Sequence, residues 1–373
     1  MEHREKITSI VAALLPWYAE NARDLPWRRT KDPYLIAVSE IMLQQTQVKT
    51  VIPFFERWQR ELPTIQAAAN ASPDRLHKLW EGLGYYSRVR NLQKAAQIIV
   101  ARHGGMFPEA FDEVLALPGI GRYTAGAICS IAFNQPVPIL DGNVMRVLTR
   151  VFGIAGNPRE KAVNERLWGL AGELVRQAVH AGRARSRAPQ TPGRAPASCS
   201  RLNQSLMELG ALVCTPRQPQ CAVCPVKNSC MARRENRVAE LPNLGPRVPV
   251  TRRHFVAFVI ERDGRYLVRQ RPAGVVNAHL WEFPNVETSG APVRPEEILA
   301  SEFGLAAGVI APLVTIKHSI TRYRMTVSAF KVVSAAGGVR RPLVWKSPGQ
   351  LEGLALTSAH RKILKGAGKK PEA

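Results

Sequence analysis

The chain has 373 residues, with 52 lysines and arginines against 29 aspartates and glutamates, so its formal net charge is +23 at pH 7. Hydrophobic residues make up 45% of the sequence and charged residues 22%, which excludes wholesale disorder and predicts two or three folded domains. No apolar run reaches the roughly 18 residues that a membrane span needs, and the opening MEHREKITSI carries two glutamates before any hydrophobic stretch. We therefore expect a cytoplasmic protein, associated with the nucleoid, that has no membrane partner. The positive charge favours nucleic acid as the partner, although a solvated basic surface would have the same composition.

The pattern over residues 7–180 is helical, because apolar residues recur every three or four positions and proline and glycine fall between the segments. One helix is marked by Asp32 as its N-cap and Pro33 as its first residue. The sequence predicts that this helix continues to a stop before Pro53.

Glu40 lies in this helix among apolar residues. In a continuous helix Glu40, Gln44 and Gln47 share one face, so the pattern predicts a polar stripe buried among hydrophobic side chains. Solvated residues on an exposed face are the alternative. A desolvated carboxyl has a raised pKa, which suits a proton donor.

Residues 111–132 carry a helix–hairpin–helix signature, with a turn over Leu117-Pro118-Gly119-Ile120-Gly121. The two glycines permit a tight turn, and the amides that open the second helix form a seat for an anion such as a DNA phosphate. A plain turn between helices could also use Pro-Gly. Asp141 follows at the start of another helix, where it is expected to act as the N-cap and to keep its charge at neutral pH.

The second half of the chain changes character. Residues 181–201 are rich in arginine and proline and predict a mobile loop that contains Cys199. Residues 233–253 predict a linker. Beyond it, HFVAFVIERDGRYLVRQRP reads as two strands joined across Arg262-Asp263-Gly264, and VTIKHSITRYRMTVSAFKVV as a second strand pair, so this domain is expected to be α+β.

Four cysteines lie within seventeen residues in a C-x6-C-x2-C-x5-C pattern, namely Cys214, Cys221, Cys224 and Cys230. This density is typical of a metal site rather than of core packing. Zinc sites usually use two C-x2-C pairs, whereas a single pair with wider arms is closer to thiolate ligation of an iron–sulfur cluster. We therefore predict a 4Fe–4S cluster in the loop 214–230 and keep zinc as the alternative. Cys129 lies in an apolar run and is expected to be a small buried residue.

The order of these features resembles the helix–hairpin–helix DNA glycosylase superfamily that includes endonuclease III. Four segments, LPWR, SEIMLQQTQV, LGYYSR and LDGNVMRV, are more similar to the A/G-specific adenine glycosylases of the MutY family. The resemblance implies an all-α glycosylase domain over residues 1–232, with its iron–sulfur loop, and a Nudix-like domain over residues 254–366. It implies a base-excision repair enzyme, expected to be a monomer, that acts on double-stranded DNA with adenine opposite 8-oxoguanine or guanine.

The resemblance also implies the roles of the site residues. Glu40 would protonate N7 of a flipped-out adenine, and Asp141 would stabilise the sugar cation electrostatically or covalently. Asn143 would orient Asp141 or the water, and Tyr123 would hydrogen-bond beside them. Endonuclease III-like glycosylase/lyases have a Schiff-base lysine where this chain has Tyr123, so hydrolysis without lyase activity is expected. DNA contacts are expected from Gln44, Gln45, Thr46, Tyr85, Leu117, Gly119, Gly121 and Arg122.

The C-terminal domain is expected to read the lesion rather than to hydrolyse pyrophosphate, because VETSGAPVRPEEILASEFG lacks the ordered glutamates of a working Nudix enzyme. The family carries H-x-F-S/T-H in a hairpin that contacts 8-oxoguanine. The matching residues here are His318, Ser319, Ile320, Thr321 and Arg322. Ile320 replaces an aromatic residue that could stack, and Arg322 replaces a histidine and adds a two-pronged donor. Ordinary strand residues are the alternative.

Two other functions compete with the adenine glycosylase. One is an endonuclease III-like glycosylase/lyase for damaged pyrimidines, against which Tyr123 and the C-terminal domain argue. The other is a non-catalytic iron–sulfur protein that binds DNA, against which the presence of both Glu40 and Asp141 argues.

Overall fold

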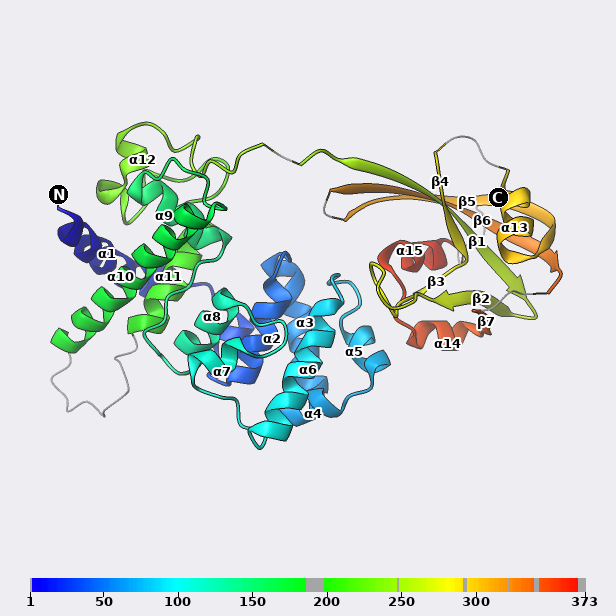
Figure 1. Ribbon diagram of the computed structural model, residues 1–373, viewed down its shortest axis with the longest axis horizontal. Helices are drawn as coiled ribbons and strands as arrows, with labels where there is room; N and C mark the ends of the chain where they lie inside the picture. The colour runs from blue at the N-terminus through cyan, green and yellow to red at the C-terminus, as the bar shows by residue number, and fades with distance from the viewer. Residues whose placement is uncertain are drawn as a thin grey trace. The chain divides into compact units, whose positions relative to one another are not determined.

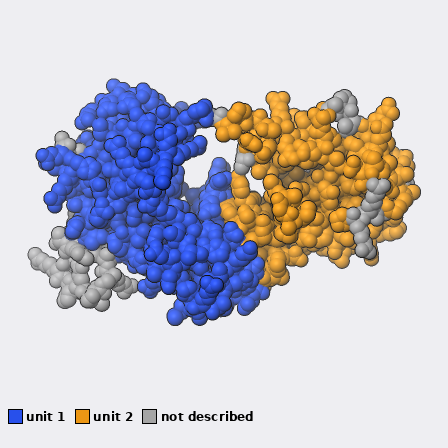
Figure 2. Space-filling view, viewed as in Figure 1, with its two compact units in different colours: residues 1–70, 91–247 blue, residues 71–90, 248–373 orange. Residues whose placement is uncertain are grey.

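A computed structural model describes residues 2–185, 198–246, 248–290, 294–320, 322–338 and 342–367 (Figure 1). The chain divides into two compact units, which Figure 2 shows in different colours. Unit 1 comprises Met1–Asn70 and Asn91–Arg247, and unit 2 comprises Ala71–Arg90 and Val248–Ala373. No helix among the described residues has both the length and the apolar character that crossing a membrane requires.

The regular elements of unit 1 are helices, as the three- and four-residue spacing predicts. Around the central helix α11 pack α1, α8, α9 and α10, and α2 packs against α8. The bounds are α1 His3–Asn21, η1 Pro26–Arg28, α2 Pro33–Leu43, α3 Val48–Glu61, α4 Ile65–Asn70, α6 Ser87–Arg102, α7 Phe111–Leu115, α8 Arg122–Ala132, α9 Gly142–Phe152, α10 Lys161–Arg185, α11 Ser198–Leu212, η2 Lys227–Ser229 and α12 Met231–Arg234. The first four residues of α6 belong to unit 2.

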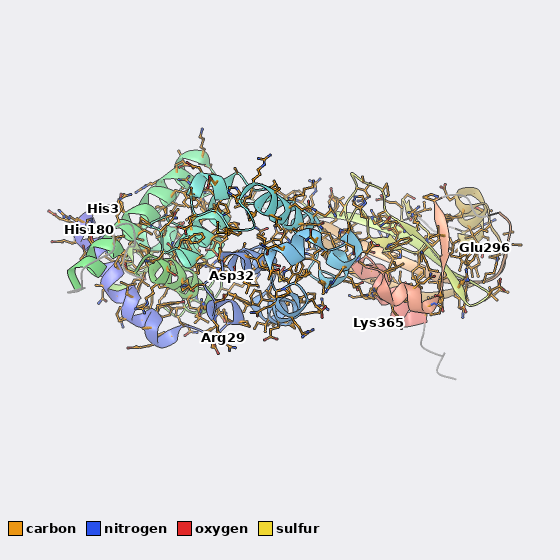
Figure 3. All side chains as sticks on the ribbon, turned by 90° about the horizontal axis from the view of Figure 1, so that it is seen from below. His3, Arg29, Asp32, His180, Glu296 and Lys365 are labelled. Carbon is orange, nitrogen blue, oxygen red and sulfur yellow. The ribbon has the colours of Figure 1, made fainter. Side chains whose placement is uncertain are left out.

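Helix α2 begins as predicted but ends early. Asp32, labelled in Figure 3, accepts a hydrogen bond from the amide of Tyr34 and caps the helix. The helix ends at Leu43, and Gln45 adopts a left-handed backbone with φ of 58°. The predicted continuous helix to Pro53 is therefore wrong: a second helix, α3, starts at Val48 and contains Pro53. The predicted stripe fails with it, because Gln44 and Gln47 lie in the break while Glu40 stays inside α2.

The helix–hairpin–helix is confirmed as α7, a turn and α8. Gly119 in the turn has φ of +77°, and a Cβ there would lie 2.7 Å from the Cβ of Asn91. This position requires glycine for its conformation and for its close approach. Gly121 is the N-cap of α8.

The ends of the arginine-rich segment are helical rather than a loop. Helix α10 reaches Arg185 and α11 starts at Ser198, so Cys199 is a fully buried helical residue and its predicted loop placement is wrong. Residues 186–197 lie outside the described residues. Cys129 is buried in α8, as its apolar neighbours predict.

Unit 2 is built on a seven-stranded sheet with helices on both faces (Figure 1). Strand β1 pairs parallel with β6 and antiparallel with β2 and β4, β5 pairs antiparallel with β6, and β7 pairs with β2. The bounds are α5 Pro73–Leu79, β1 Thr251–Arg262, β2 Arg265–Gln270, β3 Trp281–Glu282, β4 Asn285–Thr288, α13 Pro295–Phe303, β5 Ala306–Ile320, β6 Tyr323–Ala336, β7 Leu343–Lys346, α14 Pro348–Gly353 and α15 Ser358–Ala367.

Strand β1 has apolar side chains on both of its faces. Ala257 and Val259 pack in one cluster with α14 and α15, while Phe258 and Ile260 pack in another with α13. Alternation between two buried faces explains why the strand reads as an almost continuous apolar run. The α+β class and the two strand pairs are confirmed.

Candidate active site

Glu40 lies inside α2 and is only 5% exposed. Burial disfavours its charged form and raises the pKa of the carboxyl to about 7. The hydrogen bond from Tyr123 opposes this shift, and the nearby charge of Asp141 adds to it. A carboxyl of this pKa holds a proton on a substantial fraction of molecules near neutral pH.

Tyr123 is the second residue of α8, the second helix of the hairpin. Its hydroxyl donates a hydrogen bond to Oε2 of Glu40 at 2.5 Å and also lies 3.5 Å from the sulfur of Met207. Burial raises the pKa of Tyr123 well above its ordinary value, so this phenol remains a donor. Because α2 packs against α8, the hairpin turn sets the position of Tyr123 beside Glu40.

Asp141 caps α9 and has several hydrogen bonds of its own. Its Oδ1 accepts from the amide of Val144 at 2.7 Å, and its Oδ2 accepts from Nδ2 of Asn143 at 2.8 Å. Arg146 in turn donates to Oδ1 of Asn143, which fixes the orientation of that amide. Burial raises the pKa of Asp141, whereas the donors from Val144 and Asn143 lower it. Asn143 is therefore positioned as an orienting residue for Asp141.

These groups line one cavity of about 550 Å³. Its walls come from the segment before α2, from α2 and the break after it, from both ends of α8, and from the start of α9 and the middle of α11. The predicted residues that line it are Glu40, Gln44, Gln45, Thr46, Tyr123, Asp141 and Asn143. The structure thus brings together residues that are up to 103 positions apart, 143 − 40, in the chain.

Glu208, which our sequence reasoning missed, lies in the same cavity with Arg23 and Arg28. Its side chain is 1% exposed and pairs with Nη2 of Arg23 at 2.7 Å and of Arg28 at 2.8 Å. Burial alone would raise the pKa of Glu208, but the hydrogen bonds from Arg23 and Arg28 bring it to about 2. Two sequence features could have indicated this pair: Glu208 is the single acid in the apolar helix LNQSLMELGALVC, and Arg28 is the arginine of LPWR.

The other predicted DNA contacts are not among the described residues that line this cavity. Leu117 is buried in the hairpin turn, and Gly119 and Gly121 are in the same turn. Arg122 starts α8, where its guanidinium is paired with Glu165 and lies 4.2 Å from the ring of Trp168. Tyr85 belongs to unit 2 and is 38% exposed on a left-handed backbone with φ of 47°.

The four cysteines of the 214–230 loop line a second cavity and none forms a disulfide. Arg150, which lines it too, donates from Nη1 to Sγ of Cys214 at 3.4 Å. Burial raises the pKa of Cys224 to about 11 and raises that of Cys230. Among the described residues no group of three or more histidines, cysteines or acids forms a metal-ion site. The four cysteines thus share the wall of one cavity.

The candidate lesion-reading residues lie where β5 turns into β6. Ile320 pairs with Tyr323 across the turn, and Arg322 lies over the ring of Tyr323 and donates to its hydroxyl at 3.2 Å. Ser319 and His318 precede them in β5, and burial lowers the pKa of His318. Thr321 lies outside the described residues.

Known protein families match both parts of the chain. Residues 38–173 match the HhH-GPD superfamily of base excision DNA repair proteins, and residues 255–366 match the NUDIX domain. The chain is 33% identical to the adenine DNA glycosylase of Homo sapiens over 96% of its own length and 74% of that protein. It belongs to the adenine DNA glycosylase family.

The adenine DNA glycosylase of Mus musculus is 36% identical over 84% of this chain and 67% of its own length. Among solved structures, a thermostable thymine-DNA glycosylase matches 62% of this chain and 98% of its own with 27% identity and a TM-score of 0.52. The predicted fold class, a helix–hairpin–helix glycosylase domain followed by a Nudix-like domain, is thereby confirmed for this adenine DNA glycosylase family member.

Proposed function

We propose that this protein removes adenine that is mispaired with 8-oxoguanine or guanine in double-stranded DNA, by hydrolysis and without lyase activity. The observation that carries the proposal is the pairing of Glu40, with its pKa of about 7, and Asp141 in one cavity. Glycosidic bond cleavage requires both a proton donor for the leaving group and a carboxylate for the sugar cation.

Glu40 supplies the proton in this mechanism. Its burial keeps a proton available near neutral pH, and Tyr123 binds Oε2 and leaves Oε1 free to carry that proton towards N7 of adenine. Protonated adenine is a better leaving group because the electrons of the breaking bond flow into a cationic ring.

Asp141 stabilises the cation that remains on the sugar. The donors from Val144 and Asn143 favour its charged form and hold both oxygens in place. A fixed carboxylate in a buried site stabilises positive charge more effectively than one in water, because it does not have to reorganise. Asn143 also offers an amide that can orient the attacking water.

A duplex hides both reacting atoms, so the adenine must leave the helix to reach Glu40. The cavity offers the rigid pair Arg28 and Glu208 as polar groups for the edge of the base and apolar walls, among them Leu43 and Ile131, for its faces. The exposed Gln45 and the adjoining Thr46 at its rim are candidates for DNA contacts.

The absence of lyase activity follows from the amines at the site. The described residues that line the cavity include two arginines, Arg23 and Arg28, and no lysine. A guanidinium stays protonated and cannot form a Schiff base with the sugar. Tyr123 holds the position where a lysine would be expected in a glycosylase/lyase.

One experiment tests this function as a whole. Duplexes with adenine opposite 8-oxoguanine, guanine, cytosine or thymine are incubated with the protein, and half of each sample is treated with alkali. We expect strand scission only after alkali and only for the first two duplexes. Scission without alkali, or trapping of a covalent complex by borohydride at the catalytic rate, would contradict hydrolysis.

We also propose that Cys214, Cys221, Cys224 and Cys230 hold a 4Fe–4S cluster. Their fit to it is supported by a shared cavity, the lack of disulfides and the neighbouring cation of Arg150. When bound, the cluster supplies structural cross-links to a loop that has little core of its own. The chain's own contribution is Lys227 and Arg217, which the loop would present to phosphates.

Replacement of Cys221 tests the cluster. Cys221→Ser should lose iron, visible absorption and DNA affinity together, while Cys199→Ser, a cysteine buried outside the loop, should keep the iron. A colourless Cys221→Ser protein with unchanged DNA affinity would contradict the positioning role, and zinc in the purified protein would contradict the cluster.

A further inference from the structure

Residues 71–90 are part of unit 2 and group with the C-terminal domain by their contacts, although the chain on either side of them belongs to unit 1 (Figure 2). The segment contains α5, the loop 80–86 and the first residues of α6, and its side chains Leu76, Trp80 and Tyr86 are buried. Helix α6 then continues from this segment into unit 1.

Glu81 is the polar centre of this segment. Its Oε1 accepts from the backbone amide of Leu356 at 3.0 Å and pairs with Nη2 of Arg361 at 2.6 Å. Its Oε2 accepts from Nζ of Lys78 at 3.0 Å, and both Lys78 and Arg361 also donate to the carbonyl of Leu354. The Glu81 side chain is 16% exposed and that of Arg361 22%, so solvent screens this pair less than it screens a surface ion pair.

Glu81 lies in the same loop as Tyr85, four residues before it in the chain. Gly84 and Tyr85 adopt left-handed backbones, and Arg88 lies over the rings of Tyr85 and Trp80 and donates to the carbonyl of Gly84. Trp80 donates to the same carbonyl. The loop is therefore a closed, hydrogen-bonded unit that presents the exposed ring of Tyr85.

On the other side Arg361 leads to the hairpin of β5 and β6. Arg361 lies on α15, whose Ala359 and Ile363 pack in one apolar cluster with Val314 and Ile316 of β5. The same strand ends at His318–Ile320, the candidate lesion-reading residues. Packed side chains thus connect the Tyr85 loop to this hairpin through Glu81 and Arg361.

We propose that Glu81 and Arg361 are positioning residues that hold the Tyr85 loop in register with the lesion-reading hairpin, so that recognition of the oxidised base determines how fast adenine is removed. The inference rests on the proposed reading role of that hairpin. Neither residue is among the described residues that line the cavity of Glu40 and Asp141, so their loss should change discrimination between opposite bases rather than the chemical step.

The test compares Glu81→Gln and Arg361→Met with the wild type in single-turnover reactions on adenine opposite 8-oxoguanine and opposite guanine. We expect the ratio of the two rates to fall about fivefold in either variant, with the rate opposite guanine little changed. The double variant should lose no more than the single ones, because both remove the same link. Glu297→Gln, which breaks an exposed ion pair with Arg294 in the same unit, is the matched control and should keep the ratio.

Urea unfolding of each variant separates a folding defect from this effect, since lost stability lowers both rates together. Additive losses in the double variant, or unchanged ratios in both single variants, would overturn the coupling. If Arg322→Ala lowers the ratio while these two variants do not, the coupling alone fails. If the wild type itself shows no preference for 8-oxoguanine, the reading role and the coupling both fail.

Discussion

Three carboxyl groups line one cavity in three different environments. Glu40 is buried with Tyr123 as its hydrogen-bond donor, and its pKa rises to about 7. The Glu208 side chain is also buried, but two arginines bring its pKa to about 2. Burial raises the pKa of Asp141, while hydrogen bonds from Val144 and Asn143 at the N-terminus of α9 oppose that rise. Burial therefore raises the pKa of Glu40, whereas two arginines more than offset burial at Glu208, so Glu40 is the acid that still holds a proton to donate near neutral pH.

Glu40→Gln should abolish base removal and leave DNA binding intact. An amide of the same shape keeps the hydrogen bond from Tyr123 but cannot donate a proton to adenine, so the single-turnover rate should fall at least about a hundredfold. Glu165→Gln, an exposed acid paired with Arg122, is the control and should retain the rate. A Glu40→Gln protein that keeps a tenth of the rate, a deficit of about 1.4 kcal/mol, would not fit a proton donor.

The same carboxyl should make stability depend on pH. Its folded pKa of about 7 lies above its ordinary value of 4.5, so the folded state binds the proton more tightly than the unfolded state. The stability that this provides, about 3 kcal/mol, is complete below pH 4.5 and is lost as the pH rises through 7. Glu40→Gln lacks this dependence. Relative to wild type, its free energy of unfolding should therefore rise by roughly 2 kcal/mol between about pH 5 and about pH 8.

Urea titrations of both proteins at the two pH values measure this difference, and Glu165→Gln again serves as the control because its carboxyl is exposed. Parallel stability curves for wild type and Glu40→Gln would show that Glu40 ionises in the folded state as it does in the unfolded chain.

At the scale of elements, the sequence predicted those features that local chemistry determines. The Asp32 cap, the turn from Leu117 to Gly121 and the strand pair across Asp263-Gly264 depend on a few neighbouring residues, and all three are present. The break after Leu43 was missed because Gln45 adopts a left-handed conformation there, and glutamine is not one of the residue types that are typical of turns.

The parts of the site that depend on tertiary packing were also missed. Glu208 reaches the cavity only because α11 packs in the centre of unit 1. No local pattern connects it with Arg23 or Arg28, which lie 185 and 180 residues earlier in the chain. The association of residues 71–90 with the C-terminal domain was missed for the same reason, since their pattern is that of any short helix and turn.

Two glycines of the hairpin turn, Gly119 and Gly121, differ in whether their backbone conformation requires glycine. Gly119→Ala should destabilise the protein by about 1 kcal/mol or more and weaken DNA binding, because its φ is +77° and the new Cβ would meet Asn91. Gly121→Ala, in the same turn, has ordinary backbone angles and no atom within 4 Å of its new Cβ, so it should retain stability. Thermal unfolding and DNA titrations measure both effects, and equal tolerance of the two changes would remove the conformational requirement at Gly119.

At the scale of the whole molecule, positive charge can contribute to DNA binding in two ways: through general attraction to the duplex, and through specific recognition of the lesion. The net charge of +23 favours binding to any duplex, and such binding weakens steeply with salt. Discrimination needs groups that meet a base edge, and the hairpin between β5 and β6 offers Arg322, whose guanidinium is exposed and held against Tyr323. A planar two-pronged donor can bind a base edge in a way that a lysine ammonium cannot.

Arg322→Ala should therefore lower the rate on adenine opposite 8-oxoguanine about tenfold more than on adenine opposite guanine, because its guanidinium would bind the C8 oxygen, which only the oxidised base carries. Arg322→Lys keeps the positive charge but loses the planar guanidinium. Compared with Arg322→Ala, it should therefore restore the salt dependence of DNA binding but not the ratio of the two rates. Single-turnover rates on both duplexes, with affinities at several salt concentrations, distinguish the cases. Equal losses on both duplexes, reversed by lysine, would make Arg322 a phosphate contact. Unchanged rates would place recognition of the oxidised base outside this hairpin.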